Sequence, residues 1–166
     1  GARAVARRSF CPCVLTREEV ARIFAVAGDV LPSHACHIGP YRHLVMPELL
    51  RILFCCGLRI REALKLRIRD VDLQAGVITI RRGKFRRDRL VPLHPALTQR
   101  LRTYNRRLGA RGADSPFFVD RHGGALSYGT TREVFGAMID RAGIARHGPR
   151  RPTLHSARHT FASLRL

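Results

Sequence analysis

The chain has 166 residues, 45% of them hydrophobic, which predicts a single domain with its own hydrophobic core rather than a disordered segment. The formal net charge of +19 is far from neutral, so we expect a polyanionic partner, with nucleic acid as the first choice. The sequence has no apolar run of transmembrane length and no lipidation motif, which makes an anionic membrane the less favoured partner.

The five cysteines are an odd number, and no signal sequence is evident, so we expect a reducing, cytoplasmic setting. Cys55 and Cys56 lie in the apolar run LLRILFCCGL and are expected to be small core residues. A metal-free loop is the preferred interpretation of the other cysteines, because their spacing does not fit a zinc site well. The alternative is a zinc site made of Cys11, Cys13, Cys36 and His37.

The N-terminal part of the chain divides into a linker and the start of a domain. Residues 1–13 are basic and turn-rich and are expected to be a linker, so the domain is expected over residues 14–166. Thr16 and Glu19 form a capping-box pattern that predicts a helix, and the Gly and Pro content of residues 28–40 predicts a loop after it.

The middle of the chain contains the most regular patterns. The run that starts at Leu44 is apolar nearly all round, which predicts a buried helix ending at Gly57. Another helix is expected to begin at Ile60. Two β-rich pieces at 77–81 and 89–93, separated by a charged loop, predict a hairpin with a basic tip.

The rest of the chain adds mostly helix. An amphipathic helix is expected at 94–108, a short strand at 116–119, a helix from the capping box of Thr130 and Glu133 through Ala142, and a last helix from Ala157, capped by Ser156. The predicted class is therefore α+β, mostly helical with a small antiparallel sheet.

The acidic residues argue against a metal-dependent hydrolase. The chain has 12 of them, scattered, and only Asp70 and Asp72 form a close pair, which is more typical of turn caps. No G-x-S-x-G motif for acyl transfer is present. The residue types that do recur, arginine and histidine, suit a bound phosphodiester, because arginine binds two phosphate oxygens at once and histidine can move a proton near neutral pH.

Two features are ambiguous when taken singly. The stretch HSARH at 155–159 has the residues of a phosphate site, although an exposed basic helix start has the same pattern. Lys84, one of only two lysines, is alone no more than a solvated loop charge. Lysine matters here because it can give up a proton, which arginine does far more reluctantly.

Three segments in fixed order make these features specific. They are CGLRIREALKLRIRDVDL at 56–73, GVITIRRGKFRRDRLVPL at 76–93 and LHSARHTFA at 154–162. Together they resemble the tyrosine recombinase (phage integrase) family, whose members cut and rejoin DNA through a covalent phosphotyrosine. The resemblance runs from LTREEV to the last residue, and it implies the DNA breaking-rejoining enzyme fold.

The resemblance implies a role for each matching residue. Arg59 and Arg158 match the two arginines that hold the scissile phosphate, and Lys84 matches the lysine that protonates the leaving 5′ oxygen. His155 matches the histidine that contacts the phosphate. Glu62 matches a supporting acid, and His159 is expected to be structural or supporting.

The resemblance also implies a nucleophilic tyrosine beyond the second arginine. Tyr41, Tyr104 and Tyr128 all precede HSARH and match no such position, so we expect a catalytic domain truncated before its nucleophile and inactive in cleavage by itself. Phe85, where the family usually has glycine, and Ser156-Ala157, where an acidic-Leu pair is common, are smaller departures.

The implied partner is duplex DNA, and no metal or nucleotide cofactor is expected. The longer protein is expected to assemble as a tetramer on paired DNA sites, as its family does. Two alternatives remain open at this point: a non-catalytic DNA-binding remnant or regulator derived from an integrase, and a basic scaffold that binds RNA.

Overall fold

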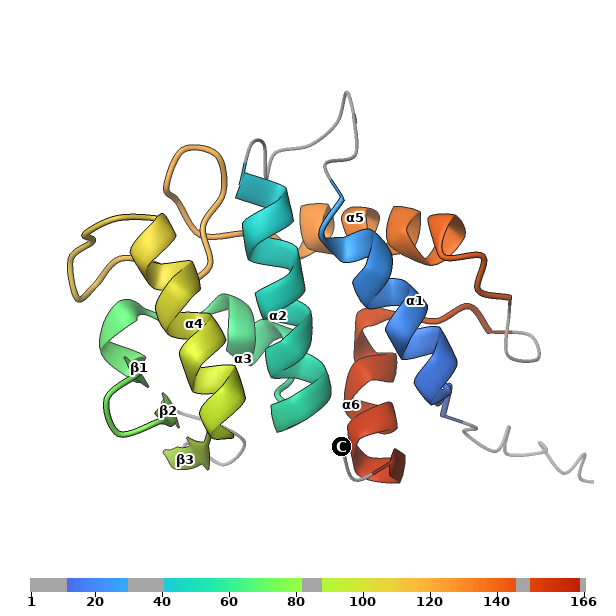
Figure 1. The fold of residues 1–166 in the computed structure, drawn as a ribbon, viewed down its shortest axis with the longest axis horizontal. Helices are drawn as coiled ribbons and strands as arrows, with labels where there is room; N and C mark the ends of the chain where they lie inside the picture. Colours follow the sequence, from blue (N-terminus) through green and yellow to red (C-terminus); the bar gives the residue numbers. More distant parts are fainter. Residues whose placement is uncertain (1–11, 30–40, 82–87, 146–149, 165–166) are drawn as a thin grey trace, which may run out of the picture.

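The computed structural model describes residues 12–29, 41–81, 88–145 and 150–164. Figure 1 shows α2 in the middle of the molecule, with α4 on one side and with α6 and α1 on the other. The helices are α1 (Arg17–Ala27), α2 (Arg42–Cys56), α3 (Ile60–Leu64), the 3₁₀ helix η2 (Ile68–Asp70), α4 (Pro95–Arg107), α5 (Tyr128–Arg141) and α6 (Leu154–Leu164). The strands are β1 (Val71–Asp72), β2 (Val77–Ile80) and β3 (Arg89–Pro92). The predicted α+β class, mostly helical with a small antiparallel sheet, is confirmed.

Helix α2 is the centre of the core because most of its residues are buried. Ten of its residues are buried, and it packs against α6, α4, α1 and α3. The nearly uniform apolar sequence from Leu44 predicts this position, and the helix ends at Gly57 as expected. Gly57 has φ 63°, a left-handed conformation that favours glycine.

The sheet is a three-stranded antiparallel meander in the order β1-β2-β3. The predicted hairpin is confirmed, with Ile78 opposite Val91 and Ile80 opposite Arg89, and its tip at 82–87 lies outside the described residues. The third strand is β1, not the expected 116–119. Phe117 and Phe118 instead go into the core beside the Tyr104 ring, and residues 116–119 form only isolated bridges at their ends.

Two helices begin earlier than their sequences suggest. Helix α5 begins at Tyr128, because Ser127 is its N-cap and its Oγ accepts a hydrogen bond from the Thr130 backbone N–H at 3.1 Å. The predicted capping box at Thr130 is therefore wrong. Helix α6 begins at Leu154, so Ser156 lies inside the first turn, where its Oγ accepts from the Thr153 backbone N–H. His155 and Arg158 consequently lie on the same helix.

The prediction for the paired cysteines is half correct. Cys55 is exposed on α2, whereas Cys56 is partly buried and packs against the core. The capping box of Thr16 and Glu19 at the start of α1 is confirmed. In the ranges that the structure describes, every helix is too short or too polar to cross a bilayer.

Gly57 should tolerate no side chain. A Cβ at this position would lie 2.3 Å from Cδ1 of Phe161, and the left-handed backbone costs a non-glycine residue about 1–2 kcal/mol by itself. We therefore expect Gly57→Ala to lower the free energy of unfolding by about 2 kcal/mol or more, measured by urea denaturation.

Gly28→Ala is the matched control. Gly28 has φ −82° and no atom within 4 Å of its would-be Cβ, so this change should leave the free energy of unfolding nearly unchanged. Equal losses in the two variants would contradict the close packing of Gly57 against Phe161.

Candidate active site

The site is built around the start of α3, where Arg59 is the N-cap residue. The Glu62 carboxylate, three positions later, accepts a hydrogen bond from the Arg59 backbone N–H at 2.9 Å and from the Arg59 guanidinium at 3.2 Å. The Arg59 side chain is 42% exposed, so part of it remains open to solvent. One carboxylate thus begins the helix and orients the arginine that precedes it.

Arg89 binds the same carboxylate from the other side. Its two terminal nitrogens donate to the two oxygens of Glu62 at 2.9 and 2.8 Å, a bidentate pair that links the first residue of β3 to α3. Burial alone would raise the pKa of Glu62, but the hydrogen bonds from Arg89 and Arg59 outweigh burial and lower this pKa to about 2. Glu62 is therefore ionised at neutral pH.

The Arg158 side chain, on α6, reaches the segment that precedes α3. Its guanidinium donates to the backbone oxygen of Gly57 at 2.7 Å, across 101 positions of sequence. Burial lowers the pKa of Arg158, and the positive charges of Arg59 and Arg89 lower it further, whereas Glu62 raises it. These four charged groups therefore lie within electrostatic reach of one another, with three cations and one anion.

The two histidines are placed by α6. His155, Arg158 and His159 have the spacing i, i+3 and i+4, so they share one face of the helix. His155 is exposed, and His159 is half-buried. Lys84 lies outside the described residues, in the segment that joins β2 to β3. The structure thus brings together Arg59, Glu62 and Arg158, with His155 on the same helix as Arg158.

Sequence reasoning missed Arg89. The segment FRRDRLVPL contains three arginines within four positions, and nothing in it separates Arg89 from its neighbours. The available signal was its place as the first residue of the second hairpin strand, next to the loop that carries Lys84.

Neither carboxylate of the pair considered for metal binding is free for that purpose. Asp70 is buried and accepts from the Arg81 side chain at 2.6 Å and from the Arg67 backbone N–H at 3.0 Å. Asp72 accepts from two backbone N–H groups of the following turn. In the described ranges, no three His, Cys, Asp or Glu side chains are grouped to hold a metal ion. Of the zinc alternative, Cys13 is described and carries a free thiol, whereas Cys11, Cys36 and His37 lie outside the described residues.

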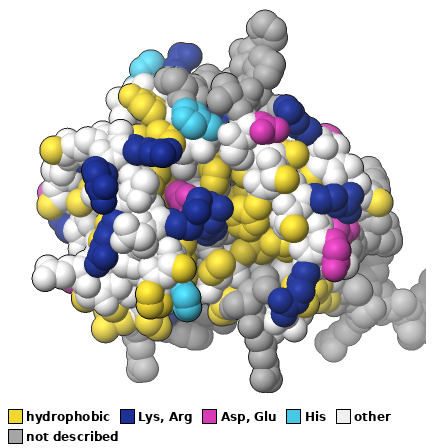
Figure 2. Space-filling model, in the orientation of Figure 1, with side chains coloured by type: hydrophobic (Ala, Val, Ile, Leu, Met, Phe, Trp, Pro, Cys, Tyr) yellow, Lys and Arg dark blue, Asp and Glu magenta, His cyan; other side chains and the backbone are white. Residues whose placement is uncertain are grey.

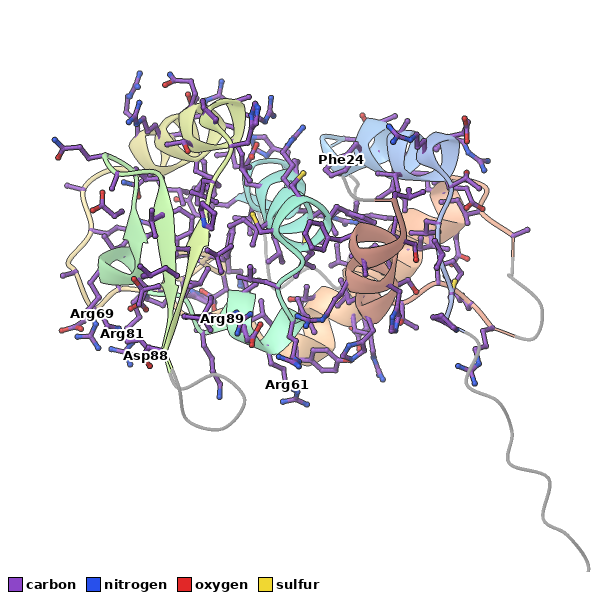
Figure 3. The ribbon with its side chains drawn as sticks, turned by 90° about the horizontal axis from the view of Figure 1, so that it is seen from below. Phe24, Arg61, Arg69, Arg81, Asp88 and Arg89 are labelled. Atoms are coloured by element: carbon purple, nitrogen blue, oxygen red, sulfur yellow. The ribbon has the colours of Figure 1, made fainter. Side chains whose placement is uncertain are left out.

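A cleft adjoins one side of the site, and neither Arg158 nor Arg89 is among its lining residues. The cleft has a volume of about 1030 Å³, begins at Arg59 and Glu62, and continues past Arg61 and Lys65. Figure 3 shows three of its lining residues, Arg61, Arg69 and Arg81, on the side of the molecule opposite Phe24. The charge is not concentrated at one place: Figure 2 shows Lys and Arg side chains in separate groups around a largely hydrophobic middle of one face, with acidic ones at only a few places. Geometry, rather than net charge, therefore locates the site.

Comparison with known proteins assigns the chain to a family. The model of the phage integrase family matches residues 14–164. The Sinorhizobium fredii protein y4rB, whose name places it among integrases or recombinases, is 32% identical over 92% of this chain and 49% of its own length. Tyrosine recombinase XerC of Oceanobacillus iheyensis is 33% identical over 92% of this chain and 47% of its own. The chain belongs to the phage integrase family.

The solved structures agree with this assignment. The crystal structure of the XerH site-specific recombinase bound to its difH substrate, a pre-cleavage complex, matches with a TM-score of 0.70 and 27% identity over 92% of this chain and 42% of that one. The fold is that of the tyrosine recombinase catalytic domain. The chain spans about half the length of the curated relatives it matches.

Glu62 should contribute a pH-dependent part of the stability. Its pKa is lowered from an ordinary 4.5 to about 2, so the ionised form is favoured in the folded state. This contribution is fully present above about pH 4.5 and is lost as the pH falls toward about 2. We expect Glu62→Gln to unfold more easily than the unchanged chain at pH 6 and the difference to shrink below pH 4.5, measured by urea denaturation at each pH.

Glu133→Gln is the matched control, because it makes the same change at an exposed acid on α5. It should leave the free energy of unfolding at pH 6 nearly unchanged. A Glu62→Gln effect that stays constant from pH 6 to pH 2.5 would contradict the lowered pKa.

Proposed function

We propose that this chain is the phosphate-binding part of a site-specific DNA recombinase, in which Arg59 and Arg158 together hold the scissile phosphate. The observation that supports this most is the anchoring of both arginines at one place. Arg59 is held by Glu62, and Arg158 is held by the backbone oxygen of Gly57, two residues before Arg59. A pair of guanidinium groups fixed in this way suits the oxygens of one phosphodiester.

The proposed step is an in-line displacement at phosphorus. A tyrosine hydroxyl attacks, a bond forms between its oxygen and phosphorus, and the bond from phosphorus to the 5′ oxygen breaks. The two arginines stabilise the negative charge that grows on the non-bridging oxygens. In this proposal Lys84 gives a proton to the departing 5′ oxygen, His155 contacts the phosphate and accepts the proton that the tyrosine hydroxyl releases as it attacks, and His159 supports the site. The step needs no metal or nucleotide cofactor.

The proposed partner is duplex DNA. The net charge of +19 favours a polyanion, and matched recombinase structures such as XerH were solved in complex with DNA. The longer protein would act as a tetramer on paired sites, as its family does.

We further propose that none of the three tyrosines in this chain is the nucleophile. Tyr104 is buried, its hydroxyl donates to the backbone oxygen of Phe117 at 2.9 Å, and burial raises its pKa, all of which oppose its use in an attack. Tyr128 has the Arg61 guanidinium over its ring at 4.8 Å, and Tyr41 precedes α2. In the family the nucleophile follows the second arginine, so the 166-residue chain alone should be inactive in cleavage.

The chain should bind duplex DNA with steep salt dependence and form no covalent adduct. Each neutralised phosphate releases a counterion, so six or more contacts should weaken binding by roughly three orders of magnitude between about 50 and 200 mM salt. Fluorescence anisotropy measures the binding, and a denaturing gel reveals any adduct.

A weak dependence on salt would contradict a partner bound through its phosphates. A DNA-linked species that survives denaturation would show that one of the three tyrosines is the nucleophile. Preference for an RNA duplex over DNA in competition would instead support the RNA-scaffold alternative.

Lys84 can be tested in a protein in which this region is joined to a tyrosine-bearing segment of the family. Lys84→Ala should slow cleavage of normal DNA by roughly two to four orders of magnitude, because an alkoxide is a poor leaving group without an acid. DNA with sulfur at the 5′ bridging position should be cleaved almost normally, since a thiolate leaves without that proton.

The matched comparison is Lys84→Arg, which keeps the positive charge but releases its proton too reluctantly to act as an acid, so it should cleave normal DNA as poorly as Lys84→Ala. Failure of the sulfur substrate to restore cleavage by Lys84→Ala would rule out the acid role. Such a result would leave Lys84 as a simple phosphate contact.

A further inference from the structure

Arg89 lies where it can influence the orientation of the Arg59 side chain, because both arginines contact Glu62. It is the first residue of β3, and its side chain is 38% exposed. Both of its terminal nitrogens are used by Glu62, at 2.9 and 2.8 Å. The same hydrogen bond raises the pKa of Arg89, so the pair is fully ionised at neutral pH.

The Glu62 carboxylate is saturated by its partners. Each of its oxygens accepts one bond from Arg89 and one from Arg59, where the Arg59 donors are the backbone N–H and a single guanidinium nitrogen. The guanidinium contact of Arg59, at 3.2 Å, is the longest of the four. Arg89 therefore binds the carboxylate through both of its terminal nitrogens, whereas the Arg59 guanidinium binds it through only one.

The difference between the two arginines matters because an arginine that binds a carboxylate through both terminal nitrogens is a poor ligand for phosphate. Without Arg89, the charge of Glu62 would have Arg59 as its adjacent cation, and the Arg59 guanidinium could turn its own fork toward the carboxylate. Phosphate would then have to compete with Glu62 for Arg59.

We propose that Arg89 is a positioning residue that occupies Glu62 and so keeps the Arg59 guanidinium available for the phosphate. This inference rests on the proposed function, because it assumes that Arg59 binds phosphate. Arg89 acts through Glu62, and it joins the hairpin strand that follows the Lys84 loop to the helix that begins after Arg59. A change at the hairpin can therefore alter the phosphate site by way of a single ion pair.

Inorganic phosphate is the probe for this inference. Its binding to the 166-residue chain can be followed by the backbone amide resonances of residues 57–60 in NMR titrations. Arg89→Ala should raise the apparent dissociation constant at these resonances by roughly three- to tenfold, in the range of coupling between neighbouring charged groups. Adding Glu62→Gln to Arg89→Ala should restore most of the affinity, since the competing carboxylate is then neutral.

The matched control is Arg100→Ala. Arg100 on α4 is likewise paired with an acid, Glu48, that also binds a second arginine, Arg51, and its replacement removes the same charge. It should change the dissociation constant at residues 57–60 by less than twofold. Urea denaturation of every variant confirms that each is folded at the titration temperature.

The outcomes separate three explanations. Loss of affinity in Arg89→Ala without recovery in the double variant would overturn the inference and make Arg89 either a direct phosphate ligand or a residue of purely structural importance. Unchanged affinity in Arg89→Ala would overturn it as well, provided that Arg59→Ala and Arg158→Ala do weaken phosphate binding. If neither of these last two variants weakens binding, the proposed phosphate site itself is wrong.

Discussion

The turn at Gly57 is the constraint on which the rest of the site depends. It ends the central helix α2 in a left-handed conformation, so that the chain can change direction and begin α3 three residues later. Its missing side chain lets the Phe161 ring of α6 approach, and its carbonyl oxygen accepts the hydrogen bond from Arg158. One glycine therefore sets both the direction of the segment that carries Arg59 and the distance of the helix that carries Arg158.

Repulsion among the arginines opposes this arrangement, and the packing of the core maintains it. Three arginines lie within reach of one another around a single carboxylate, and the pKa of Arg158 is lowered by burial and by its cationic neighbours. Such a cluster is destabilising in isolation, and the packing of α2 against α6 maintains it. The phosphodiester that we propose to bind there would balance this excess of positive charge.

Local patterns in the sequence were enough to predict most of the fold. The capping box at Thr16, the apolar run of α2 and the two strands of the hairpin each depend on neighbouring residues, and the structure has them. The failures have different causes. Ser127 rather than Thr130 caps α5 through the Thr130 backbone N–H three residues later, a local contact, whereas tertiary packing takes residues 116–119 into the core instead of the sheet.

The candidate site shows the same limit. The spacing of Arg59 and Glu62 is local, and the resemblance to recombinases named Arg158, but no spacing rule could predict that Glu62 would also bind Arg89, 27 positions later. Nothing in the sequence distinguishes Arg89 from the two arginines shortly before it. Its contact with Glu62 follows from its place at the start of β3, where it lies opposite Ile80.

The central claim is that Arg59 and Arg158 bind one and the same phosphate group. A crystal structure of the chain soaked with tungstate, a tetrahedral oxyanion that is easily located by its anomalous scattering, tests this claim most directly. We expect one oxyanion contacted by the guanidinium groups of both arginines, while Glu62 remains bound to Arg89. An oxyanion held by only one of the two arginines, or none at this place while others occupy the surface, would contradict it.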